Sequence, residues 1–210
     1  ANTNPPTNIE KLEPNVQVMI VGGRRPRNTL PEQREAIAQL QAGWRAKTEN
    51  PIMIFENYPF SSRGFYLPAF VSKVQGESIN KLKGVSLGED IWLSMRQDFD
   101  TVDIGFNHFQ VYFTARAYWG GKAYDPVGEL TEYCRLFYGP AGKPRQAFFQ
   151  YSEPNYQPME KDKAKVDQAL GLFDAAKTVL HADSVYATRL GLIDVFLNTL
   201  RSKSKLLGRK

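Results

Sequence analysis

The stretch between residues 51 and 92 decides the fold class. The apolar run PIMIF (Pro51–Phe55) stops at the polar ENY (Glu56–Tyr58), and the later run KGVSLG (Lys83–Gly88) stops at EDIW (Glu89–Trp92). Each run is typical of a short buried strand whose far end carries a carboxylate beside an aromatic residue. In a (β/α) barrel the loops that follow the strands build the functional site, so the pattern predicts an α/β fold with its chemistry at these two strand ends.

An earlier strand–helix unit precedes this stretch. Residues Asn15–Val21 are rich in β-branched residues, which is typical of a strand. A helix is expected to follow, with Thr29 as its cap, Pro31 in its first turn and Glu32 in the capping-box position. After the second strand, a helix is expected over Leu67–Lys83, with a break near Gly76.

Repeated strand–helix units predict parallel strands with helices packed outside them. Because a closed barrel needs eight strands over roughly 250 residues, the three expected strands cannot close one by themselves. Two architectures remain open at this point. The chain is either part of a (β/α) barrel or an open three-stranded sheet with its own core, which leaves two unpaired edges.

The second half of the sequence is predicted to be helical. Polar residues over 98–107 indicate a loop, and the boundary between the βα part and the helical part is expected near residues 93–105. Asp125 followed by proline predicts a capped helix that ends at Gly139. Two long amphipathic patterns then predict an antiparallel helical hairpin, whose second helix is capped by Asp183 or Ser184.

Composition limits the function classes. The chain has 210 residues and a net charge of +5, with much of the positive excess in the last ten residues. No RNP-like motif, zinc-finger spacing or phosphate-binding loop is present, so we expect no nucleic-acid partner, metal or cofactor. No apolar run approaches the ~20 residues that span a bilayer. The chain begins at Ala1 without a leader, which suggests that the start of the protein is missing.

A single cysteine rules out a disulfide within the chain. Cys134 lies in a helical pattern and is interpreted as a small core residue rather than a nucleophile.

Two segments carry a family resemblance. GFNHFQVYFTARAYW (Gly105–Trp119) contains the pattern YxxARxxW, and DPVGELTEYCRLFYGPA (Asp125–Ala141) opens with Asp-Pro and ends in FYGxA. Together they resemble the bacterial family catalogued as domain of unknown function 4838, and the opening residues 1–6 and 14–16 look like a mid-barrel stretch of that family.

The resemblance implies a fold and an activity. The family is similar to α-glucuronidase-type glycoside hydrolases, which have a hexosaminidase-like N-terminal domain, a (β/α)₈ barrel and a helical C-terminal region. By this resemblance, residues 1–97 are the last βα units of the barrel and residues 98–210 are an all-helical C-terminal region. The chain is then a fragment whose partner is the missing N-terminal barrel segment, and the protein is secreted, periplasmic or on the cell surface.

The two acidic strand ends supply the catalytic candidates. Glycoside hydrolysis uses two carboxyl groups across the scissile bond, so Glu56 and Glu89 are the expected pair, with Asp90 competing with Glu89. Asp90 is also a candidate for binding substrate. The alternative is that the two glutamates are solvated loop carboxylates or bind backbone amides. A further alternative is that the general acid lies upstream of residue 1.

Other polar and aromatic residues are candidates for binding carbohydrate. Tyr58 and Trp92 offer faces that stack on sugar rings, although both also suit a core. Asn57 is a candidate for a hydrogen bond with a sugar hydroxyl group, because of its position directly after Glu56. Arg24 and Arg25 suit a uronic acid carboxylate, or belong to a plain surface loop.

Three functions remain open after this reading. The first is a glycoside hydrolase-like protein acting on polysaccharide or oligosaccharide, with uronic acids among its expected substrates. The second is a non-catalytic carbohydrate-binding or scaffold protein, and the third is a helical interaction module. His108 is either a site edge or a helix-capping or packing residue.

Overall fold

A small parallel sheet is the centre of the first half of the protein. In the computed structural model, the described residues are 4–22, 30–58, 72–93, 100–121, 124–194 and 197–209. The strands are β1 (Met19–Val21), β2 (Ile52–Tyr58) and β3 (Ser86–Leu93), and they pair in the order β1-β2-β3. Both pairings are parallel, so each strand must be followed by a crossover before the next one begins.

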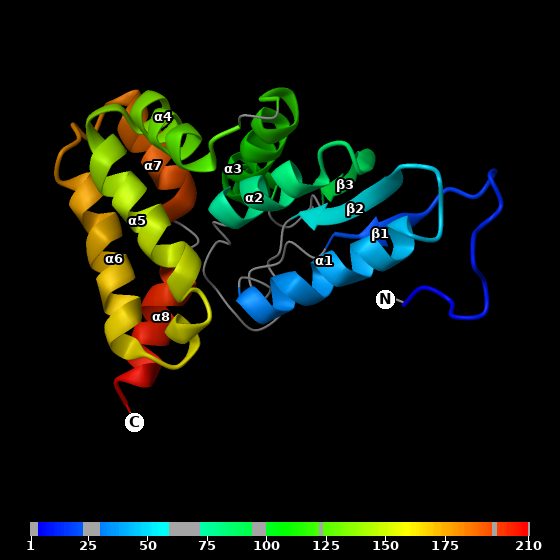
Figure 1. Cartoon of the computed structure of the whole chain (residues 1–210). Coiled ribbons are helices and arrows are strands. Elements are labelled where there is room, and N and C mark those ends of the chain that lie inside the picture. Colours follow the sequence, from blue (N-terminus) through cyan, green and yellow to red (C-terminus); the bar gives the residue numbers. More distant parts are fainter. Residues whose placement is uncertain are drawn as a thin grey trace.

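Helices make up most of the remaining structure. α1 (Pro31–Arg45) lies between β1 and β2 in the sequence, and α2 (Ser72–Leu82) precedes β3. The later helices are α3 (Asp100–Trp119), α4 (Pro126–Tyr138), α5 (Gly142–Asn155), α6 (Lys163–Lys177), α7 (Val185–Asp194) and α8 (Leu197–Leu207), with 3₁₀ turns η3 (Gly139–Ala141) and η4 (Pro158–Glu160). Helices α4 to α8 stand together beside the sheet unit, and α2 and α3 lie on the side of that unit nearer to them (Figure 1). None of the described helices is long and apolar enough to cross a lipid bilayer.

Both crossover helices pack on the same face of the sheet. Alternate residues of β1 and β2 point toward α1 and α2, because successive side chains of a strand point to opposite faces. The resulting core joins Val18, Ile20, Ile52 and Ile54 to Leu82 of α2, with Leu40 and Trp44 of α1 packed against it. Met19 lies on the opposite face and is 49% exposed.

The expectation of barrel units is wrong for the described residues. They form one open sheet of three strands, and helices dominate the rest of the described chain. The sheet has β1 at one edge and β3 at the other, so it does not close on itself. The open three-stranded sheet, the alternative left by the sequence, is the architecture that the structure contains. Nothing in the fold depends on the strand number, tilt and stagger that closure requires.

The strands end later than the sequence predicted. Glu56 lies inside β2 and is paired in register with Ile91, while Asp90 lies inside β3 opposite Phe55. The prediction placed strand ends at the first polar residues. It failed because the backbone hydrogen bonds of a parallel ladder do not depend on the polarity of the side chain. The first strand is shorter than predicted and begins at Met19.

Three helix predictions are also corrected. α1 is capped by Leu30 without a side-chain hydrogen bond, and Thr29 lies outside the described residues. α2 continues through Gly76, where a Cβ atom would lie 2.6 Å from Pro126 of α4, so this glycine permits close helix packing rather than a break. α3 already begins at Asp100, within the predicted loop.

The remaining helix caps match the sequence patterns. Asp125 accepts a hydrogen bond from the Val127 amide at the start of α4, and Gly139 ends that helix with φ of 53°. Ser184 accepts from the Ala187 amide at the start of α7. The expected last helix is described as α7 and α8, with residues 195–196 between them outside the description.

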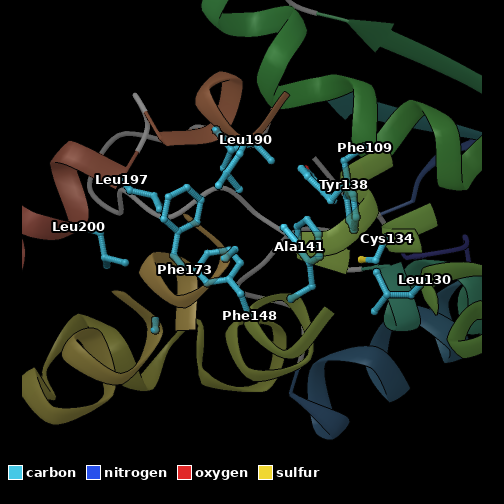
Figure 2. Close-up of a cluster of buried hydrophobic side chains, with 14 of the residues drawn as sticks. Phe109, Leu130, Cys134, Tyr138, Ala141, Phe148, Phe173, Leu190, Leu197 and Leu200 are labelled. Carbon is cyan, nitrogen blue, oxygen red and sulfur yellow. The ribbon is translucent and has the colours of Figure 1, made fainter. Parts of the chain in front are cut away.

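A large aromatic core holds the helical region together. Side chains from six helices converge in it, and Figure 2 shows Phe109, Leu130, Phe148, Phe173, Leu190 and Leu197, which come from α3, α4, α5, α6, α7 and α8 in that order. Cys134 also lies in this cluster and is 1% exposed. The interpretation of Cys134 as a core residue is therefore confirmed, and burial raises the pKa of its thiol to about 12.

An arginine lies inside this core. Arg145 of α5 is fully buried, and its guanidinium carbon lies 4.4 Å from the ring centre of Phe148, 4.5 Å from that of Phe149 and 4.7 Å from that of Phe173. Ring faces attract a cation, and the weakly hydrated guanidinium loses less on burial than an ammonium group. Burial raises the pKa of Tyr138, and a hydrogen bond with Arg145 acts in the opposite direction.

We predict that Arg145→Lys destabilises the protein by about 2 kcal/mol, because a strongly hydrated ammonium would replace a planar group stacked on aromatic rings. Urea denaturation of the variant and of wild type measures this difference. Arg135→Lys is the matched control, because Arg135 is exposed on α4 and should change stability by less than about 0.5 kcal/mol. Equal stabilities for the two variants would contradict the structural role of Arg145.

Candidate functional site

The pairing of β2 with β3 brings the two predicted catalytic glutamates to one face of the sheet. Glu89 is in register with Ile54, and Glu56 is in register with Ile91. Because residues two apart on a strand share a face, Glu56 and Glu89 lie on the face that α1 and α2 cover. Strands about 4.8 Å apart and an offset of two residues place their Cα atoms ~8 Å apart.

Both carboxylates are removed from solvent. Glu56 is 1% exposed, and both carboxylate oxygens of Glu89 are buried. The expectation that they are solvated loop residues is therefore wrong. Burying an ionised carboxylate is costly unless neighbouring groups compensate its charge, so this face of β2 and β3 differs from ordinary surface.

Gly22 makes room for the Glu56 side chain. The amide N–H group of Gly22 donates a hydrogen bond to the carbonyl oxygen of Phe55, which fixes the backbone of the chain just after β1 against β2. A Cβ atom on Gly22 would lie 1.9 Å from Oε1 of Glu56 and 2.7 Å from Cγ2 of Ile54. The glycine is required by this close approach, because any larger residue would displace the carboxylate.

Asp90 does not share the glutamate face. It is in register with Phe55, one residue out of phase with Glu56, and it is exposed. Of the two acidic residues that competed for the second catalytic role, the structure places Glu89 beside Glu56 and puts Asp90 on the opposite face.

The remaining predicted site residues are placed only in part. Asn57 and Trp92 are register partners on β2 and β3, and Tyr58 is the last residue of β2. Their side chains lie outside the described set, so the structure does not test their stacking or hydrogen-bonding roles. Arg24 and Arg25 fall in residues 23–29, which lie outside the description altogether.

Two hollows adjoin the helices that cover the sheet. The first has a volume of about 500 Å³, lies between α1 and α2, and has Gly22 in its lining. The second, of about 400 Å³, lies between α2, α4 and α5. Arg34, Val74 and Glu77 line both hollows, so the two are neighbours along α2.

Glu153 of α5 lines the second hollow and is the titratable group that sequence reasoning missed. Its carboxylate accepts hydrogen bonds from the amides of Val74 (2.8 Å) and Lys73 (3.2 Å) in the first turn of α2. Burial raises the pKa of Glu153 to about 7, and the two amide hydrogen bonds oppose this shift. The contact joins residues 79 and 80 positions apart, and no local pattern signals a partner at that distance.

The region around His108 is a packing cluster. Nε2 of His108 lies 2.6 Å from the hydroxyl oxygen of Tyr133, and its ring stacks on Phe137 at 4.9 Å. This geometry favours the packing role. Among the described residues, no three His, Cys, Asp or Glu side chains gather in a way that would hold a metal ion.

Comparison with known proteins adds no relative: no family model, curated protein or solved structure matches the chain.

We predict that Gly22→Ala destabilises the protein by about 1–3 kcal/mol, because the added methyl group overlaps the Glu56 carboxylate and Ile54. Chemical denaturation of Gly22→Ala, Glu56→Ala and the double variant forms a cycle. Shortening Glu56 removes the closest clash, so Gly22→Ala should cost less in the Glu56→Ala background. Additive effects would contradict the contact between the two residues.

We also predict that Glu153 lowers the stability of the folded protein by an amount that depends on pH. Its folded-state pKa of about 7 lies above the ordinary glutamate value of 4.5, so the unfolded chain releases this proton at lower pH than the folded chain does. Stability contributed by the protonated carboxyl is therefore complete below about pH 4.5 and is lost as the pH rises to about 7. Glu153→Gln keeps an acceptor for the α2 amides without the charge.

Urea midpoints measured from pH 4.5 to 8 test this prediction. The stability of Glu153→Gln relative to wild type should increase through this window and then level off, with exposed Glu160→Gln as the control. A difference that stays constant with pH would show that Glu153 ionises as it does in the unfolded chain.

Proposed function

We propose that this protein is a glycoside hydrolase-like protein that acts on polysaccharide or oligosaccharide, with Glu56 and Glu89 as its working carboxylates. One observation carries the proposal: the two glutamates lie on the same face of adjacent parallel strands, ~8 Å apart at their Cα atoms. Side chains that start from such positions reach either the ~5 Å separation of retaining enzymes or the ~6.5–9.5 Å separation of inverting ones.

The chemistry needs one carboxyl group that gives a proton and one that stays ionised. Burial favours the protonated form of a carboxyl group, whereas nearby hydrogen-bond donors and cations favour the ionised form. We propose that one of Glu56 and Glu89 supplies the proton and that the other stays ionised. Tyr58, two residues after Glu56 on β2, is proposed to stack on the sugar, and Arg24 and Arg25 to bind its uronic acid groups.

The resemblance of Gly105–Trp119 and Asp125–Ala141 to a family similar to α-glucuronidase-type hydrolases also supports a carbohydrate substrate. The proposal requires only that neighbouring strands place their carboxylates on one face of the sheet. It does not need a closed barrel.

A second candidate is a carbohydrate-binding protein without hydrolytic activity. The burial of Glu56, which is 1% exposed and lies against Gly22, favours this alternative. A catalytic carboxylate must reach the glycosidic oxygen or a water molecule, whereas a structural carboxylate needs only protein partners.

Turnover of aryl glycosides and aldouronic acids by Glu56→Gln and Glu89→Gln separates these functions. If the pair is catalytic, we expect each variant to lose at least about 100-fold in kcat, because acid–base catalysis contributes that much, while affinity for the sugar is kept. Glu32→Gln, an exposed change on α1, is the control. Asp90→Asn should lose less activity than Glu89→Gln.

Sugar binding without turnover in wild type and in all variants would favour the non-catalytic candidate. The absence of both binding and turnover across these substrates would reject both carbohydrate functions.

A further inference from the structure

The hollow between α1 and α2 has the dimensions of a small-molecule site. Its volume of about 500 Å³ is in the range of about 300–1,000 Å³ that is typical of ligand pockets. Its lining on α1 runs from Arg34 to beyond Arg45, and at 1.5 Å per residue those eleven steps give a length of ~16 Å. The shape is therefore a groove along two neighbouring helices.

Part of the groove lining is apolar. Ile37, Ala38 and Ala42 line it from α1, while Val74 and Leu82 line it from α2. Ala42 is exposed, so no larger side chain of α1 fills the space at that position. Apolar surface of this kind is stabilised when a nonpolar ligand removes it from water.

The charged residues of the lining are mostly cationic. Arg34, Arg45 and Lys81 line the groove, and Glu77 is the acidic residue of the lining. Nη1 of Arg34 donates to Oε2 of Glu77 at 3.1 Å. The Arg34 side chain is 39% exposed, so the open part of its guanidinium can donate to a further acceptor.

The Arg34–Glu77 ion pair is open to exchange. Their side chains are 39% and 41% exposed, and ion pairs with such exposure contribute little to stability. An incoming carboxylate can therefore replace Glu77 at Arg34, and the planar guanidinium then binds it through two parallel hydrogen bonds.

We propose that the groove between α1 and α2 binds an amphipathic organic carboxylate, whose apolar body lies along Ile37, Ala42 and Leu82 and whose carboxylate binds Arg34. This site is separate from the carbohydrate function proposed above. The lining favours a ligand that is both anionic and apolar. An uncharged hydrocarbon makes no charge-assisted hydrogen bond with Arg34, and a sugar acid without an apolar body buries no apolar surface in the groove.

Decanoate is the probe for this proposal, with decanol and glucuronate as controls. Isothermal titration of the full chain should show one decanoate site, with decanol and glucuronate each binding at least about tenfold more weakly. Arg34→Gln should weaken decanoate binding about tenfold, because a charge-assisted hydrogen bond is lost. Glu77→Gln should strengthen it about two- to fivefold, because the competing carboxylate is gone.

Two alanine substitutions on α1 form the matched pair for the groove itself. Ala42→Leu fills the groove and should abolish decanoate binding, whereas Ala36→Leu, also exposed on α1 but outside the lining, should leave it unchanged. Thermal melts of both variants check that each is folded.

Several outcomes would overturn the proposal. Equal affinity for decanoate and decanol would show that Arg34 takes no part. Equal loss in Ala36→Leu and Ala42→Leu would place binding elsewhere. No decanoate binding by folded wild type would exclude this ligand class and leave the groove without the proposed role. None of these results depends on glycoside turnover, so the carbohydrate proposal stands or fails separately.

Discussion

The handedness of the two crossovers determines which face of the sheet α1 and α2 cover. The strands pair in their sequence order, and a parallel crossover is almost always right-handed. Two right-handed crossovers that step in the same direction must place their helices on the same face of the sheet. That is where α1 and α2 lie, packed on Val18, Ile20, Ile52 and Ile54. The same constraint sets the two helices side by side with a groove between them, and it puts Glu56 and Glu89 beneath their layer.

The position of α2 depends in turn on the helical region. Glu153 of α5 accepts from two amides in the first turn of α2, while Gly76 in the middle of α2 allows Pro126 of α4 to approach closely. Near the end of the helix, the side-chain amide of Asn80 donates to the carbonyl oxygen of Tyr124 at 2.9 Å. The three contacts fix α2 along its whole length. A carboxylate at a helix N-terminus is favourable, but its burial is costly, and at Glu153 the burial has the larger effect on the pKa.

The sequence predicted the presence of helices and strands better than their end points and their long-range contacts. Strong periodicity located α1, α4 and α6, and the Asp125 cap was correct because capping is a local interaction. The end of β2 was wrong because Glu56 continues the strand, and its burial depends on Gly22, 34 positions earlier. The resemblance led to a closed barrel, whereas the number of strands within the chain had already left an open sheet possible. Arg145 escaped attention because its burial depends on the packing of other helices, including the Phe173 ring of α6, and Glu153 because its partner amides lie 79 and 80 positions away.

The groove and the glutamate pair are neighbours that remain chemically distinct. Gly22 lines the groove, yet the position its Cβ atom would take overlaps the Glu56 carboxylate. Neither Glu56 nor Glu89 is among the residues that line the groove. A ligand along α1 and α2 consequently meets Arg34 and an apolar wall, but it does not meet the acidic pair. The two proposed ligands therefore have separate sites, one along α1 and α2 and the other at Glu56 and Glu89 on β2 and β3.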